Sequence, residues 1–352
     1  MIHTAPHRYL TVRTFARRLG HTMRRIPAHR PGCPTPPKIG SSQGVRQILR
    51  FRYCFLILLG FVGGCDAQEA EISYPEPRCS DYRKTPVFLV HGSGLDSTTF
   101  TPLIDAFRDA GYPRESILAI DLKPNDGDNI HAAETFIADG VRKQLAAVNE
   151  ATARLDCAMP EHTQVNIVAH SMGAFSSRWF LRYVRPEAVR SLVTLAGSNR
   201  GTDRLCGRRG RGNEQMCPAN DPAPDSAQGR LNGVPEQRLD ETPWGSGPDP
   251  DDITSMPATV NRRIAYVAIR LEPDAWIEPA SSAELAGAGG FDVSDAARYE
   301  LHETSPGNYL FTGAASHDGL PTHPAIAAFL LDGFAAEARD IAQPPGRPQT
   351  RD

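Results

Sequence analysis

A serine between two small residues, followed along the chain by an aspartate and a histidine, could carry out nucleophilic catalysis. The segment 165–173 is an apolar, β-branched stretch that runs into Ala169, His170, Ser171, Met172 and Gly173. A serine hydroxyl becomes a strong nucleophile when a histidine accepts its proton and an acid orients that histidine. Such a serine lies in a tight strand-turn-helix elbow, which requires small residues two positions before and after it. Ala169 and Gly173 meet this requirement.

The acid and the base should follow the serine in the order serine, acid, histidine. Asp274 lies just after an apolar run at 264–269, with Glu272 as its competitor. His317 lies after a predicted strand at 309–312 and before the last helix. We therefore predict Ser171 as nucleophile, His317 as base and Asp274 as acid. Less favoured candidates from the same region are Asp292, His302 and His323.

The oxyanion that forms during such a reaction needs backbone N–H donors. One is the N–H of the residue after the nucleophile, here Met172. The other is expected from the loop after the first core strand, where Ser93 follows His91 and Gly92. Glycine at position 92 lets the backbone approach a substrate closely.

Alternating strands and helices are predicted to position these residues. Continuous apolar runs predict strands buried on both faces, and apolar residues at helical spacing predict helices between them. This pattern indicates an α/β fold with a mostly parallel central sheet and helices on both faces, which binds ligands at the carboxyl ends of its strands. The predicted strands are 86–90, 117–121, 164–169, 189–196, 264–269 and 309–312, and the predicted helices are 100–107, 130–148, 172–184 and 324–338.

The pattern is interrupted between about 199 and 260, where Gly, Pro, Asp, Asn and Arg dominate. A long loop without secondary structure inside a domain is usually functional or disordered. Because it follows the strand after the elbow, we expect a lid-like or cap-like insertion over the site, with a surface excursion as the alternative. Its acidic residues are expected to be solvated rather than to bind a cation: Asp249, Asp251 and Asp252.

The N-terminal region has the pattern of an export signal. Residues 45–65 contain arginines, an apolar run of about ten residues and small residues before Cys65, which together indicate a secretory signal. The run is too short for a transmembrane span, which needs about 20 residues. The residues before Cys65 are similar to a lipobox, which predicts a lipidated Cys65 and a periplasmic or cell-surface lipoprotein. Cleavage after Ala67 and secretion is the alternative. Residues 1–44 are expected to be disordered or to precede the true start, near Val45.

Length, charge and cysteine content complete the picture of the domain organisation. The chain has 352 residues, 40% hydrophobic content and a net charge of −3, so no nucleic-acid partner is implied. We predict a linker at 66–84, one domain at 85–340 and a disordered tail at 341–352. Four cysteines lie beyond the leader, an even number that favours disulfides in an exported protein. Of the three possible pairings we favour Cys206–Cys217, which closes a local loop, with Cys79–Cys157 as the long-range pair. Zinc binding is the alternative and is less favoured, because no C-x-x-C is present.

The two glycine loops resemble those of a known family. Residues 86–94 are similar to the oxyanion segment of bacterial triacylglycerol lipases and esterases of the α/β-hydrolase fold, and 168–173 resemble the elbow of the small secreted lipases, which also have alanine at the first position. Residues 194–202 resemble the segment that follows in those enzymes. The resemblance covers roughly 85–335, but the insertion distinguishes this chain from the smallest members.

The residues and the resemblance together predict a serine carboxylic-ester hydrolase that acts on an ester or lipid. It would form an acyl-enzyme on Ser171 and need neither cofactor nor metal. The same triad would serve an acyltransferase, an amidase or a polyester depolymerase. An inactive binding protein on the same scaffold is a less favoured alternative. Membrane attachment would occur through Cys65, and the sequence does not determine the oligomeric state.

Overall fold

The computed structural model describes one structured unit within residues 70–352. Four predictions concern residues outside the described part: those for 1–44, for the signal at 45–65 with Cys65, for the linker up to residue 74 and for the tail from 343. The acidic part of the insertion, with Asp249, Asp251 and Asp252, is also outside it. The described residues are 75–125, 127–221, 223–232, 264–285 and 290–342.

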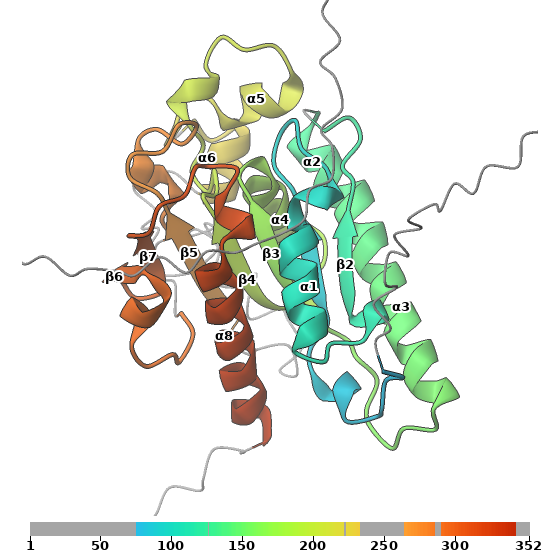
Figure 1. Ribbon diagram of the computed structural model, residues 1–352. Helices are drawn as coiled ribbons and strands as arrows, with labels where there is room; N and C mark the ends of the chain where they lie inside the picture. The colour runs from blue at the N-terminus through green and yellow to red at the C-terminus, as the bar shows by residue number, and fades with distance from the viewer. Residues whose placement is uncertain (1–74, 126, 222, 233–263, 286–289, 343–352) are drawn as a thin grey trace, which may run out of the picture. The chain divides into compact units, whose positions relative to one another are not determined.

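A seven-stranded sheet with the order β2-β1-β3-β4-β5-β7-β6 forms the centre of this unit (Figure 1). Its strands are parallel except β6, which runs antiparallel to β7 at one edge. The predicted mostly parallel sheet is therefore confirmed. The strands are β1 (Val87–Val90), β2 (Ile117–Ile120), β3 (Val165–His170), β4 (Val189–Leu195), β5 (Ala265–Arg270), β6 (Leu301–Ser305) and β7 (Asn308–Phe311).

Helices cover both faces of this sheet. α1 and α8 pack on one face, and α3 and α4 pack on the other (Figure 1). Among the described residues, no helix has the length and apolar content needed to cross a membrane. The helices are α1 (Thr101–Asp109), α2 (Asn129–His131), α3 (Ala138–Arg154), α4 (Met172–Tyr183), α5 (Arg211–Met216), α6 (Ala227–Asn232) and α8 (Pro324–Ala342), with a π-helical segment (Ala132–Ile137) joining α2 to α3.

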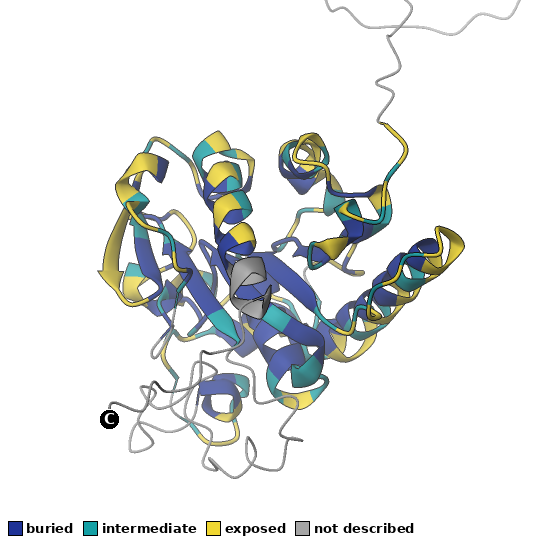
Figure 2. Ribbon diagram, turned by 90° about the horizontal axis from the view of Figure 1, so that it is seen from below, coloured by how far each residue is buried: buried dark blue, intermediate teal, exposed yellow. Residues whose placement is uncertain are grey.

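Strand β1 shows why its sequence is a continuous apolar run. Side chains alternate between the two faces of a sheet, so a strand covered on both faces must be apolar at every position. Phe88 and Val90 pack in the cluster that contains α3 and α4, whereas Val87 and Leu89 pack in the cluster that contains α1 and α8. All four are fully buried, and Figure 2 shows the central strands as buried ribbons between partly exposed helices.

The structure differs from the predictions at three places. The predicted linker is structured at its end, because Tyr82 is buried and Cys79 is in a disulfide. The edge strand β6 was not predicted, since four of its five side chains are exposed and polar. The first part of the insertion is not structureless: it contains a 3-10 helix (Asp203–Leu205), α5 and α6.

Candidate active site

Ser171 lies in the sharp turn between β3 and α4, as the elbow pattern predicts. Its backbone angles, φ 52° and ψ −123°, fall in a region that a residue with a side chain rarely adopts. Hydrogen bonds on both sides hold it there. The Ser171 N–H donates to the carbonyl of Leu195 at 3.1 Å, and the Ser171 carbonyl accepts from the backbone N–H and the hydroxyl of Ser198, each at 3.1 Å. Strain of this kind persists only where surrounding contacts determine the conformation.

The small residues around Ser171 are required by close packing. A Cβ atom at position 173 would lie 2.5 Å from the carbonyl oxygen of His91, and one at position 92 would lie 2.7 Å from the Cβ of Ser171. Both distances are shorter than van der Waals contact allows. Ala169 is fully buried in β3, where it pairs with Val90 of β1. Its methyl group packs in the core, so the first small position of the elbow accepts alanine.

Asp274 and His317, from distant parts of the chain, form a hydrogen-bonded pair. The two Asp274 carboxylate oxygens accept from Nδ1 of His317 at 2.9 and 3.0 Å, and both side chains are almost fully buried. The N–H groups of Trp276 and Ile277 also donate to Asp274, at 2.7 and 2.9 Å. Burial by itself raises the pKa of Asp274, but these hydrogen bonds and the adjacent imidazole outweigh it, so its pKa lies below the usual range.

The other candidate acids and histidines lie elsewhere. Glu272 is half-exposed and pairs with Arg270, and Asp292 is exposed. His302 lies on the exposed side of β6. His323 stands at the start of α8, 3.8 Å from Glu300. Among the described candidates, Asp274 alone forms a hydrogen bond with His317.

A cavity of about 540 Å³ joins the serine and the histidine. Ser171, Met172, Ser93 and His317 all line it. Nε2 of His317 is buried and has no hydrogen-bond partner within the described part of the chain. This nitrogen is therefore available to a proton from the serine or from a bound molecule. Hydrogen bonds between base and nucleophile often shorten only when substrate binds.

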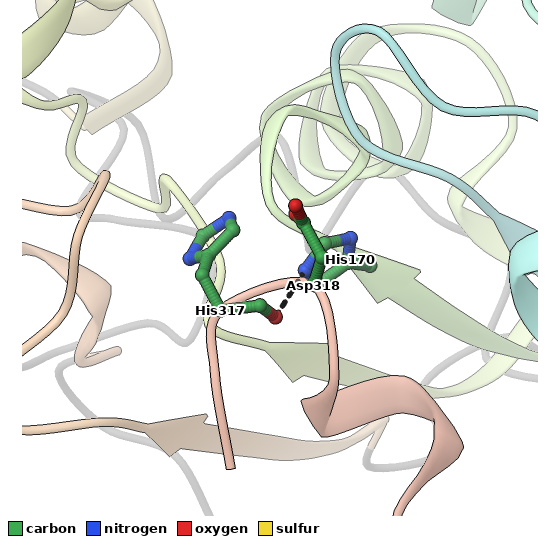
Figure 3. Close-up of side chains that lie close together, drawn as sticks. All are labelled: His170, His317 and Asp318. Carbon is green, nitrogen blue, oxygen red and sulfur yellow. Dashed lines mark hydrogen bonds between the residues drawn. The ribbon is translucent and has the colours of Figure 1, made fainter. Parts of the chain in front are cut away.

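His170, the residue before Ser171, was not singled out by the sequence beyond its place in the elbow. Its Nε2 donates to the backbone carbonyl of His317 at 3.0 Å, drawn as the dashed line in Figure 3. Burial, together with the neighbouring His317, lowers the pKa of His170 to about 3, so its ring is neutral at ordinary pH. The elbow therefore contacts the histidine loop directly. The signal in the sequence was only a histidine in an otherwise apolar stretch.

The predicted oxyanion loop is held by its neighbours. His91 is fully buried, and its Nε2 accepts from the N–H of Leu122 at 2.9 Å while its Nδ1 donates to the carbonyl of Gly92 at 2.8 Å. Because one nitrogen accepts and the other donates, the ring is neutral. The N–H groups of Ser93 and Met172 have no acceptor among the described residues, so both can donate to a ligand.

Among the described cysteines two disulfides are present, Cys79–Cys157 and Cys206–Cys217, in the pairing that the sequence favoured. The second closes the loop between the 3-10 helix and the end of α5. Hydrogen bonds also attach α5 to the core: Gln215 accepts from the N–H of Asn129 at 2.7 Å. The sequence did not reveal these attachments, because they join residues far apart in the chain.

One group of side chains among the described residues resembles a metal site. The potential ligand atoms of His170, His317 and Asp318 lie within 4.8 Å of one another (Figure 3). Both histidines are already engaged, His170 with a backbone carbonyl and His317 with Asp274. A cation bound there would occupy the base of the site, so the cluster belongs to the arrangement already described.

Comparisons with known proteins give one family match and similarities to several solved structures. A family model described as Lipase (class 2) matches residues 84–217, which include the oxyanion loop and the elbow. The chain is also similar to three solved structures. Aspergillus fumigatus lipase B is 16% identical, with a TM-score of 0.43, over 80% of this chain and 58% of that one. Bacillus licheniformis lipase BlEst2 is 14% identical, with a TM-score of 0.37, over 73% and 94%. The lin2722 gene product of Listeria innocua is 15% identical, with a TM-score of 0.38, over 70% and 94%.

This chain therefore spans 58% of the length of the Aspergillus enzyme. The parallel sheet covered on both faces, the serine elbow at the end of β3 and the family match over the same region agree with one another. The mostly parallel sheet with helices on both faces is that of the α/β-hydrolase fold, and residues 84–217 match the model of the class 2 lipases.

Proposed function

We propose that this protein hydrolyses carboxylic esters through an acyl-enzyme on Ser171, with His317 as base and Asp274 as acid. The observation that carries the proposal is the Asp274–His317 hydrogen bond at 2.9 Å, together with a serine in a strained elbow that lines the same cavity as His317. An isolated serine is unreactive, whereas a serine next to an oriented imidazole is a nucleophile. Apolar side chains in the same cavity, Leu205 and Met216, support an ester with an apolar portion.

In the first half of the reaction, Oγ of Ser171 attacks the ester carbonyl carbon while Nε2 of His317 takes the hydroxyl proton. Asp274 stabilises the imidazolium through Nδ1. The carbonyl oxygen becomes an oxyanion that accepts hydrogen bonds from the N–H groups of Ser93 and Met172. The intermediate collapses, and the alcohol leaves with the proton from His317. The acyl group remains on the serine as an ester.

In the second half, water replaces the alcohol. His317 takes a proton from the water molecule, whose oxygen attacks the acyl carbon and re-forms the oxyanion between the same two donors. Collapse then breaks the bond to Oγ, and His317 returns the proton to Ser171. The carboxylic acid is released. The two halves use the same groups in opposite order, as the symmetry of the chemistry requires.

A substitution of the nucleophile tests this proposal. Ser171→Ala should lower turnover of p-nitrophenyl butanoate by about 10⁴-fold or more and abolish labelling by a fluorophosphonate probe. Ser226→Ala is the matched control, because this hydroxyl caps α6 outside the cavity lining. It should keep both properties. Full activity or labelling in Ser171→Ala would show that another residue is the nucleophile.

We also propose that the protein is exported and anchored through a lipidated Cys65. The two disulfides support an oxidising compartment, in which such bonds persist. The signal segment itself lies outside the described residues. Intact mass of the native protein gives the test: a diacylated N-terminus at Cys65 is expected. Mature chains that begin after Ala67 without lipid would support simple secretion instead.

A further inference from the structure

We propose that the cavity selects esters that carry an anionic group, a carboxylate or a phosphate, and that Arg208 and Arg209 bind this group. The proposal rests on the ester hydrolysis proposed above and adds a substrate class to it. Both arginines line the same cavity as Ser171 and His317, and both are exposed. They belong to the insertion that begins at about residue 199, which is predicted from the sequence to lie over the site.

The described arginines of the insertion fall into two groups, those that form an ion pair with a carboxylate and those that do not. Of the four between positions 204 and 211, the two outside the cavity lining form ion pairs: Arg204 with Glu278 at 2.5 Å, and Arg211 with Asp128 at 3.6 Å. Arg208 and Arg209 have no carboxylate within 4.0 Å among the described residues. The two guanidinium groups at the cavity can therefore form ion pairs with an anionic ligand.

The loop that carries these arginines is held in place at several points. The Cys206–Cys217 disulfide closes it, and the side-chain amide of Asn213 donates to the carbonyl of Arg209 at 2.7 Å. The guanidinium of Arg208 lies over the ring of Trp276, 4.8 Å from its centroid. Trp276 belongs to the acid loop, because its N–H donates to Asp274. A cation held in this way loses less conformational freedom when it binds an anion.

The charges around the cavity favour an anion. Asp318 is the one acidic side chain in the cavity lining formed by described residues, and the same lining contains two arginines. Guanidinium groups form planar, two-point hydrogen bonds with carboxylate and phosphate oxygens. The apolar residues Leu205 and Met216 of the same insertion are available to the uncharged part of the ester. The insertion thus combines an apolar wall with a cationic rim.

The test compares matched neutral and anionic esters. On the acyl side, mono-p-nitrophenyl glutarate is compared with its methyl ester. On the alcohol side, 1-octanoylglycerol 3-phosphate is compared with 1-octanoylglycerol. The measured quantity is the ratio of kcat/KM for the anionic ester to that for the neutral ester. In the wild type at least one pair should give a ratio above one, and the pair that does so identifies which part of the ester carries the charge.

The double substitution Arg208→Gln with Arg209→Gln should lower that ratio by about tenfold, because a hydrogen bond to a charged group is worth about that factor. Lysine at both positions should recover part of it, and 0.5 M salt should reduce it in the wild type. Arg204→Gln and Arg211→Gln remove the same charge from the same segment outside the cavity lining, and should leave the ratio unchanged.

A ratio that is equal in the wild type and in the double glutamine variant would overturn the proposal, as would an equal loss in the Arg204 and Arg211 controls. These outcomes are separable from failure of the proposed function. If Ser171→Ala abolishes turnover of the neutral esters while the ratio does not respond to the arginines, the hydrolase proposal stands and only the anionic selectivity fails.

Discussion

The two walls of the cavity differ in how firmly their side chains are held. On the wall formed by the ends of the strands, Asp274 and His317 are almost fully buried and hydrogen-bonded to each other, and the backbone of Ser171 is fixed on both sides. On the wall formed by the insertion, Arg208 and Arg209 are exposed. The insertion is held by a disulfide, by a hydrogen bond to the backbone of Arg209 and by the stacking of Arg208 over Trp276, and neither arginine is buried.

This difference follows from the tasks that we propose for the two walls. Stabilising a transition state requires donors and acceptors that are already in position, because reorganisation during the reaction raises the barrier. Recognising a charged group tolerates mobile side chains, because long cationic side chains can adapt to the ligand. The strand wall should therefore respond to substitution by large losses of rate, and the insertion wall by smaller changes of selectivity.

The largest expected effect on the strand wall, after loss of the nucleophile, comes from the acid. Asp274→Asn should lower kcat by about 10⁴-fold, because the amide cannot hold the imidazole in the required tautomer. Glu272→Gln is the control, since Glu272 pairs with Arg270 at the surface and should have little effect. Steady-state kinetics on p-nitrophenyl butanoate measure both. Comparable losses in the two variants would mean that the acid is wrongly assigned.

The buried His170 should make the protein sensitive to acid. Its pKa is about 3 in the folded state, against 6.5 for an unperturbed histidine, so below pH 6.5 the unfolded chain binds a proton that the folded chain does not. Stability is therefore complete above about pH 6.5 and is lost as pH falls toward 3, by at most about 5 kcal/mol.

Urea unfolding at a series of pH values measures this sensitivity. His170→Gln removes the titrating ring and retains an N–H donor for the His317 carbonyl. The free energy of unfolding of this variant should depend less on pH between 6.5 and 4 than that of the wild type. An identical pH dependence in the two proteins would show that His170 is not the group responsible.

Glycine substitutions compare packing on the two walls. Gly173→Ala should destabilise the fold by about 1–3 kcal/mol, because the added methyl would overlap the backbone carbonyls of Val90 and His91. Gly207→Ala in the insertion meets no atom within 4 Å, and its φ of +77° costs only about 1 kcal/mol of backbone strain. Thermal unfolding should therefore show a larger fall in Tm for the first. Equal shifts would contradict the difference in packing.

The smallest expected effect concerns the disulfide of the insertion wall. Replacing Cys206 and Cys217 by serine should loosen the arginine loop and lower the anionic-to-neutral ratio of kcat/KM by about two- to threefold. The reason is that the loop then loses conformational entropy when it binds the anionic group, which weakens binding. Replacing Cys79 and Cys157 is the control. That pair closes a loop of 78 residues away from the cavity lining, so its loss should lower Tm without changing the ratio. A changed ratio in the control alone would contradict the proposal.

The elements with a strong pattern were predicted well. Val87–Val90 and Val165–His170 are continuous apolar runs, and a strand covered on both faces leaves little choice of residue there. The helices α5 and α6 were missed. Each has six residues and a mixed composition, and a helix that short is not stable by itself. They form because Gln215 bonds to Asn129 and the side chain of Asn232 accepts from the buried Arg178 at 2.7 Å.

By itself, the sequence indicated the class of fold and predicted the members of the candidate triad in their order along the chain, with Glu272 left as a competitor for the acid. Apolar periodicity and the tight elbow depend on local geometry, which neighbouring residues encode. The elbow pentapeptide has alanine where glycine is usual. The structure explains why alanine fits, because the methyl group of Ala169 is buried in the core.

The tertiary structure alone decided which acid bonds to His317 and that His170 contacts the histidine loop. It also decided that Arg208 and Arg209, which have no carboxylate partner among the described residues, line the same cavity as Ser171. Each depends on distances between residues that lie 43 to 147 positions apart, or on a cavity wall made by an insertion. Such distances arise from packing the whole sheet and its helices, and no local pattern of residue types specifies them.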